Sequence, residues 1–79
     1  MFEKELDEIK NAKNIYVNWT RGKGSLAIRE DKIFKDYAEL KEFYKWHFMT
    51  LQFVKLGDKR LDSCGLLDLV EKDLKTTNI

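Results

Sequence analysis

Helical spacing of apolar residues marks both ends of this chain. Residues 2–12 place Phe2, Leu6 and Ile9 at positions i, i+4 and i+7, with charged residues between them. This spacing gathers the three side chains on one face and predicts an α-helix. Near the other end, Asp62 or Ser63 is a candidate first residue of a second helix. The apolar face of that helix is formed by Leu66, Leu67, Val70 and Leu74.

Apolar and polar residues alternate in the segment after the first predicted helix. Residues 15–20 alternate Ile, Val and Trp with Tyr, Asn and Thr, a pattern that predicts a β-strand with Trp19 on the apolar side. Residues 21–24 (Arg-Gly-Lys-Gly) supply glycines for a tight turn, and residues 25–29 are the expected partner strand. Residues 30–34 are a candidate second turn followed by a short third strand.

No glycine interrupts the stretch from Asp36 to Leu56, which holds six of the ten aromatic residues. Asp36 followed three residues later by Glu39 matches a capping box, so we predict that a helix begins there. We predict one helix that continues to Gly57. The alternative ends the helix near His47 and makes residues 50–54 a β-strand, because those residues also suit a pleated sheet.

As one helix, this segment would carry two apolar stripes. The first would consist of Leu40, Tyr44, His47, Leu51 and Val54, and the second of Trp46, Met49, Phe53 and Leu56. One stripe is enough to pack a helix on its own core, so a second stripe requires a second covering surface. A small soluble protein rarely leaves that much apolar surface exposed. We therefore predict that the second stripe binds a protein, with coverage by the chain's own helices as the alternative.

These elements predict an α+β fold in the order α-β-β-(β)-α-α, with an antiparallel hairpin or short meander packed against helices. Seventy-nine residues are expected to form a single domain, residues 1–79. Apolar residues make up 43% of the chain and aromatic residues 13%, which argues against intrinsic disorder.

The charges nearly cancel, with 15 Lys and Arg against 14 Asp and Glu. This balance predicts no strong attraction of the whole molecule to nucleic acid or to an acidic membrane. Residues 13–35 nevertheless carry six basic residues against two acidic ones, a local charge of +4. The hairpin is therefore a candidate nucleic-acid interface, which we weigh below protein binding. Its residues would be Tyr16, Arg21, Lys23 and Arg29.

Candidate residues for chemistry are few. His47 is the only histidine, so two-histidine acid–base catalysis and multi-histidine metal sites are excluded; we expect it to be semi-buried with an engaged ring nitrogen. Cys64, the only cysteine, leaves no intrachain disulfide and is expected to be a half-buried residue at a helix start. Residues 22–25 lack the spacing of a phosphate-binding loop. No metal site or cofactor is predicted.

The sequence therefore favours a non-catalytic binding or regulatory protein that acts through protein–protein contacts. No apolar run approaches the roughly 20 residues needed to cross a bilayer, and a single cysteine suits a reducing compartment, so we expect a cytoplasmic protein without a membrane partner. Small lysine-rich chains of this kind suggest an accessory protein or inhibitor of a phage or other mobile element. The alternatives are a nucleic-acid-binding module that uses the hairpin, and a self-assembling protein, such as a homodimer.

Overall fold

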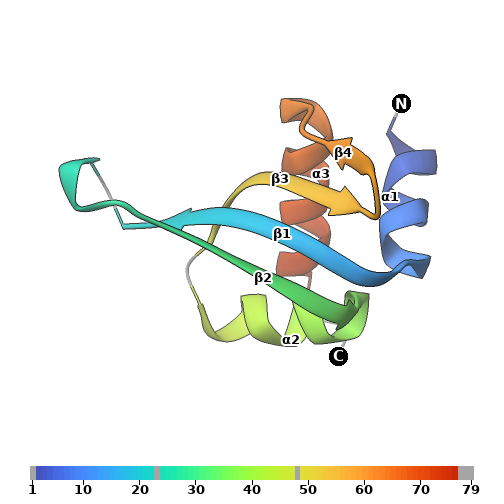
Figure 1. The fold of residues 1–79 in the computed structure, drawn as a ribbon, viewed down its shortest axis with the longest axis horizontal. Helices are drawn as coiled ribbons and strands as arrows, with labels where there is room; N and C mark the ends of the chain where they lie inside the picture. Colours follow the sequence, from blue (N-terminus) through green and yellow to red (C-terminus); the bar gives the residue numbers. More distant parts are fainter. Residues whose placement is uncertain (1, 23, 48, 77–79) are drawn as a thin grey trace.

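A computed structural model describes residues 2–22, 24–47 and 49–76, which form three helices and a four-stranded antiparallel sheet (Figure 1). The strands lie in the order β2-β1-β3-β4. In chain order the elements are α1 (Glu3–Asn11), β1 (Lys13–Arg21), the 3-10 turn η1 (Gly24–Leu26), β2 (Ile28–Asp36), α2 (Tyr37–Trp46), β3 (Thr50–Leu56), β4 (Lys59–Leu61) and α3 (Cys64–Lys75). The predicted α+β class, with an antiparallel hairpin packed against helices, is confirmed.

The hairpin of β1 and β2 is longer than the sequence indicated. The two strands pair without a break in register from Ile15 opposite Phe34 to Arg21 opposite Ile28, and their far end extends beyond the helices as an arm (Figure 1). The predicted turn at residues 30–32 and the separate strand after it are wrong, because all of these residues belong to β2. Backbone pairing with β1 holds this part of β2 extended, and Trp19 Nε1 of β1 also donates to Glu30 Oε1 at 3.2 Å.

The segment from Asp36 to Leu56 contains a helix and a strand. The helix α2 ends at Trp46, and β3 pairs with β1, so the prediction of one helix to Gly57 is wrong and its alternative is right. Leu51 and Val54 are three residues apart and would point to opposite sides of a regular strand. The register with β1 shifts by one residue between Phe53 and Leu51, so both side chains lie on the apolar side of β1 and are buried. Gly57 begins the two-residue turn between β3 and β4 with a φ of +64°, a value that favours glycine.

The predicted start of α2 is confirmed. The Asp36 side chain accepts a hydrogen bond from the backbone N–H of Glu39 at 3.0 Å. In return, Glu39 Oε1 accepts from the backbone N–H of Lys35 at 3.4 Å, one residue before the cap. This exchange satisfies a backbone donor of the first turn and makes the transition from β2 to α2 abrupt.

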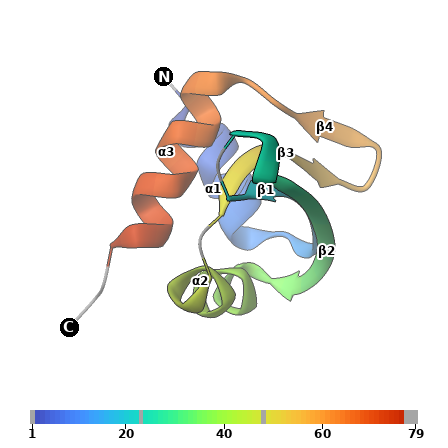
Figure 2. The ribbon, with the colours of Figure 1, turned by 90° about the vertical axis from the view of Figure 1, so that its left-hand side faces the viewer.

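One face of the sheet packs against the helices and forms the core. In Figure 2, α1 and α3 lie on one side of the strands. The sheet contributes Ile15, Val17, Trp19, Phe34, Leu51 and Val54, and the helices contribute Ile9, Leu40, Leu66, Leu67, Val70 and Leu74. The predicted apolar faces of the first and last helices and the core position of Trp19 are therefore confirmed. We call the other side of the sheet the open face; it carries Tyr16, Arg29, Ile33, Phe53, Lys55 and Arg60.

Polar contacts join the helices above this core. The Tyr37 hydroxyl of α2 donates to Asp73 Oδ2 of α3 at 2.5 Å, and Lys10 Nζ of α1 lies 3.7 Å from Asp73 Oδ1. Burial, together with the hydrogen bond to the Asp73 carboxylate, raises the pKa of Tyr37 far above its ordinary value. The phenol is therefore neutral in the folded protein at any pH near neutrality.

One buried and one exposed leucine provide a test of the core. Leu40 is fully buried in α2, whereas Leu26 at the tip of the arm is 81% exposed. We expect Leu40→Ala to lower the free energy of unfolding in urea by about 2–5 kcal/mol because it leaves a cavity. The matched variant Leu26→Ala should change it by less than about 0.5 kcal/mol. Equal effects of the two substitutions would contradict this core.

The Tyr37 hydroxyl should make the free energy of unfolding fall at alkaline pH. Below about pH 10 the phenol is protonated in both the folded and the unfolded state, so its contribution is fully present there. At higher pH the unfolded chain ionises while the folded state keeps the proton, so the free energy of unfolding falls. Urea unfolding at about pH 8 and about pH 11 should show a smaller fall in Tyr37→Phe than in the wild type. An identical fall in both proteins would contradict the burial of this hydroxyl.

Candidate functional site

The four residues predicted as a protein-binding stripe do not share a face. Trp46 ends α2, and Met49 precedes β3 and is buried. In β3, Leu56 packs against the core, whereas Phe53 contacts Tyr16 on the open face. The single stripe is therefore wrong, because it required helical spacing in a part of the chain that is extended.

Among the described residues, Trp46 is nevertheless the one aromatic side chain in the group of exposed large hydrophobic residues, at 72% exposure. It follows the buried Leu40 by six residues, a rotation of about 600°, which places it well away from the core face of α2. The indole Nε1 donates to Glu42 Oε2 at 2.9 Å, and the Lys45 ammonium lies 5.7 Å from the ring centroid. Contacts within α2 therefore orient the ring while leaving most of it in solvent.

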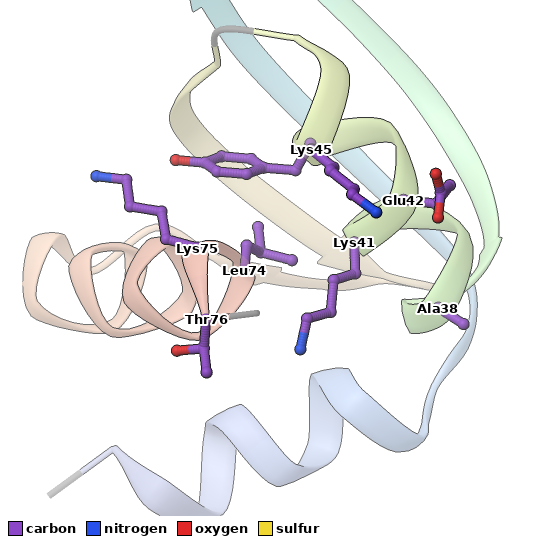
Figure 3. A pocket seen from close by; sticks show the side chains of 8 residues that line it. Ala38, Lys41, Glu42, Lys45, Leu74, Lys75 and Thr76 are labelled. Atoms are coloured by element: carbon purple, nitrogen blue, oxygen red, sulfur yellow. The ribbon is translucent and has the colours of Figure 1, made fainter. Parts of the chain in front are cut away.

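A groove lies between α2 and α3 beside this tryptophan. Figure 3 shows Lys41 and Lys45 of α2 and Leu74 and Lys75 of α3 around its first part, a concavity of about 520 Å³. A second concavity shares Tyr44, Lys45 and Lys75 with the first and extends to Trp46 and Met49. We call the two together the α2–α3 groove. Both are large enough to receive side chains of another molecule.

Cations dominate the rim of the α2–α3 groove. Its two carboxylates are already engaged, since Glu42 accepts from the Trp46 indole and Glu71 Oε2 accepts from the backbone N–H of Leu51 at 3.0 Å. Burial and the neighbouring Glu71 raise the pKa of Tyr44, which stays neutral. Among the described residues, none of the groove's lysines is in an ion pair. Because the indole and the backbone N–H are uncharged donors, both carboxylates keep their charge, and the groove combines an apolar floor with three lysines against two carboxylates.

Sequence reasoning missed this lysine rim. Lys41 and Lys45 are four residues apart and so lie on one side of α2, a spacing that the sequence displays. Lys75 is thirty residues further along the chain, and only the packing of α2 against α3 brings it to the same groove.

The candidate residues for chemistry are more exposed than predicted. His47 is exposed; its ring stacks on Phe43 with centroids 3.9 Å apart, and its Nδ1 lies 2.9 Å from the Phe43 carbonyl oxygen. The expected engagement of a ring nitrogen is therefore right, but the expected burial is wrong, because His47 lies just past the end of α2. Cys64 is also exposed at the first position of α3, so its predicted half-burial is wrong as well.

The basic residues of the hairpin do not form one patch. Arg21 pairs with Glu30, with 3.0 Å between Nη2 and Oε2, and it lies on the opposite side of the sheet from Tyr16. Arg29 is exposed on the open face, and Lys23 lies outside the described residues. The Tyr16 hydroxyl donates to Asp31 Oδ2 at 2.6 Å, which raises the pKa of Tyr16. Partner carboxylates thus offset part of the local positive charge.

No protein-family model, curated protein or solved structure matches this chain. Within the described ranges, no helix has the length and apolar character required to cross a bilayer, and no three His, Cys, Asp or Glu side chains are grouped as metal ligands would be. The α2–α3 groove and the open face are therefore the two surfaces whose geometry suggests a function.

The two tryptophans provide a direct test of this geometry. Trp19 is 3% exposed and Trp46 is 72% exposed. We expect iodide to quench the fluorescence of Trp19→Phe, which keeps only Trp46, far more than that of Trp46→Phe. The emission of Trp46→Phe should also lie at shorter wavelength, because its remaining indole is in an apolar environment. Similar quenching of the two variants would contradict the exposure of Trp46.

Proposed function

We propose that this protein is a non-catalytic module that binds another protein and regulates it. In this proposal the α2–α3 groove receives a partner segment that is acidic and carries apolar side chains. The observation that carries the proposal is the exposed Trp46 indole at one end of a groove with an apolar floor.

Trp46 has the character of an interface anchor. Tryptophan is enriched among the residues that dominate binding energy, and such residues lie next to pockets that exclude water. The ring is held by Glu42 and Lys45, so less side-chain entropy is lost when a partner covers it. Met49 and Tyr44 extend the apolar surface into the groove. Of the four residues predicted from the sequence, Trp46 and Met49 belong to this proposed site, and Phe53 and Leu56 do not.

The charge of the rim supports an acidic partner. Lys41, Lys45 and Lys75 surround the floor formed by Tyr44 and Leu74. Carboxylates of a partner would meet these ammonium groups, while its apolar side chains would contact Leu74 and the Trp46 ring. Charge complementarity of this kind increases the association rate and selects against basic partners.

A labelled peptide that alternates Glu with Leu and Phe is a suitable probe for this groove. We expect it to bind the wild type, as measured by fluorescence anisotropy, and a peptide with Lys in place of Glu not to bind. Trp46→Ala should weaken binding about 30-fold or more, because a central tryptophan contributes about 2 kcal/mol or more. The double variant Lys41→Glu/Lys45→Glu should also lose binding.

Two matched variants control for general effects of these substitutions. Leu26→Ala removes an exposed apolar side chain outside the groove, and Arg29→Glu reverses an exposed charge on the open face. Both should bind the acidic peptide like the wild type, and circular dichroism should show all variants folded. Unchanged binding by Trp46→Ala would refute the proposal. A concentration-dependent dimer that Trp46→Ala abolishes would replace it with self-assembly.

A partner captured from the native host would identify the regulated protein. Capture with the wild type and with Trp46→Ala as parallel baits should yield a protein that only the wild type retains. A captured protein whose binding segment is basic would contradict the proposed chemistry of the groove.

A further inference from the structure

The open face brings together side chains that are far apart in the sequence. The register of the sheet aligns one residue from each strand in a row across it: Ile33 of β2, Tyr16 of β1, Lys55 of β3 and Arg60 of β4. Paired residues in antiparallel strands point to the same side, so these four side chains share the open face. No helix in the described part of the chain covers that side.

Two aromatic rings form the centre of this face. Tyr16 and Phe53 lie on neighbouring strands with ring centroids 5.8 Å apart and planes tilted by 40°. The Arg60 guanidinium lies over the Phe53 ring, 4.0 Å from its centroid, and Ile33 beside Tyr16 is 61% exposed. These groups line a shallow concavity of about 390 Å³. Aromatic rings and a planar guanidinium on one surface offer stacking partners to a flat ligand.

The charge around these rings is positive. Arg29, Lys55 and Arg60 lie on the open face, and the carboxylates of Asp31 and Asp62 oppose them. Asp31 accepts the hydrogen bond from the Tyr16 hydroxyl, and Arg60 Nε lies 3.2 Å from Asp62 Oδ2. Both members of the Arg60–Asp62 pair are more than half exposed, so this pair screens the guanidinium only weakly. A ligand with a negative backbone is therefore favoured over a neutral one.

We propose that the open face binds single-stranded nucleic acid, with bases stacked on Tyr16 and on the Arg60 guanidinium that lies over Phe53, and with phosphates held by the cations Arg29, Lys55 and Arg60. Sequence-tolerant stacking on aromatic side chains beside a basic surface is the physical basis of single-strand binding. A single strand fits this face better than a duplex, because only unpaired bases expose their flat surfaces to the protein. This interface differs from the hairpin patch expected from the sequence, since it uses β3 and β4 and does not use Arg21.

This inference does not rest on the proposed function. The α2–α3 groove lies in the helical layer, and the open face is the side of the sheet that the helices leave uncovered. The two surfaces share none of the residues named for them. Loss of binding at one surface should therefore leave the other intact.

Labelled single-stranded DNA and RNA of about twelve nucleotides, with a duplex of the same sequence, are the probes for this face. Fluorescence anisotropy should show binding to the single strands and weaker binding to the duplex. With three cations in contact with phosphates, affinity for a single strand should fall about 20-fold between about 50 mM and about 200 mM salt. No binding at the lower salt concentration, or binding that does not depend on salt, would overturn the proposal.

Substitutions locate the binding surface. Tyr16→Ala and Phe53→Ala should each weaken binding about 5- to 100-fold, the loss expected when a base no longer stacks. Because Phe53 is partly buried and Arg60 lies over its ring, Lys55→Glu is the variant whose effect does not depend on the packing of that ring. Lys55→Glu and Arg60→Ala should each weaken binding and reduce its salt dependence, whereas Arg21→Ala, which removes a cation from the other side of the sheet, should bind like the wild type.

Trp46→Ala separates this inference from the proposed function. It should bind single strands like the wild type while losing the acidic peptide. If Tyr16→Ala and Lys55→Glu each bound single strands with wild-type affinity, nucleic acid would bind elsewhere and the inference would be overturned. If the wild type bound no nucleic acid and these two variants lost binding of the acidic peptide, the open face would be a protein interface instead.

Discussion

The pairing of β3 with β1 is the contact on which the rest of this structure depends. It makes β1 an interior strand, with β2 on one side and β3 on the other, and it places Val54 opposite Val17. Both valines are fully buried, so the ladder and the core are built by the same residues. Without this pairing, the β3–β4 hairpin would be detached from the rest of the sheet, and α3 would lose the strand β3, against which it packs.

Because only one face of the sheet is buried, the molecule has two chemically different surfaces. All three helices contribute to a single core on one side of β1, because alternate residues of that strand are apolar. The residues between them, such as Tyr16, necessarily point to the other side. The helical layer therefore carries the groove between α2 and α3, and the sheet itself provides the open face.

These two surfaces suit different ligands. The α2–α3 groove is concave and has an apolar floor with lysines at its rim, features that favour side chains of an acidic protein segment. The open face has a smaller concavity and presents two rings and a guanidinium on one side of the sheet, features that favour flat groups linked by phosphates. Both surfaces carry positive charge although the whole chain is nearly neutral. Two of the compensating carboxylates make contacts within the protein: Asp73 joins α2 to α3, and Glu71 accepts from the backbone N–H of Leu51.

Local pattern alone determined the first helix, the hairpin, the capped start of α2 at Asp36 and the buried face of α3, because each depends on residues close in sequence. It did not determine residues 50–56. Leu51 and Val54 are three residues apart, a spacing that suits a helix, and their neighbours also suit a strand; the free edge of β1 decided between the two. The same long-range pairing placed Phe53 beside Tyr16 and separated it from Trp46. Which side chains meet at a surface was therefore a property of the tertiary structure, since sheet register and helix packing join residues that no local period connects.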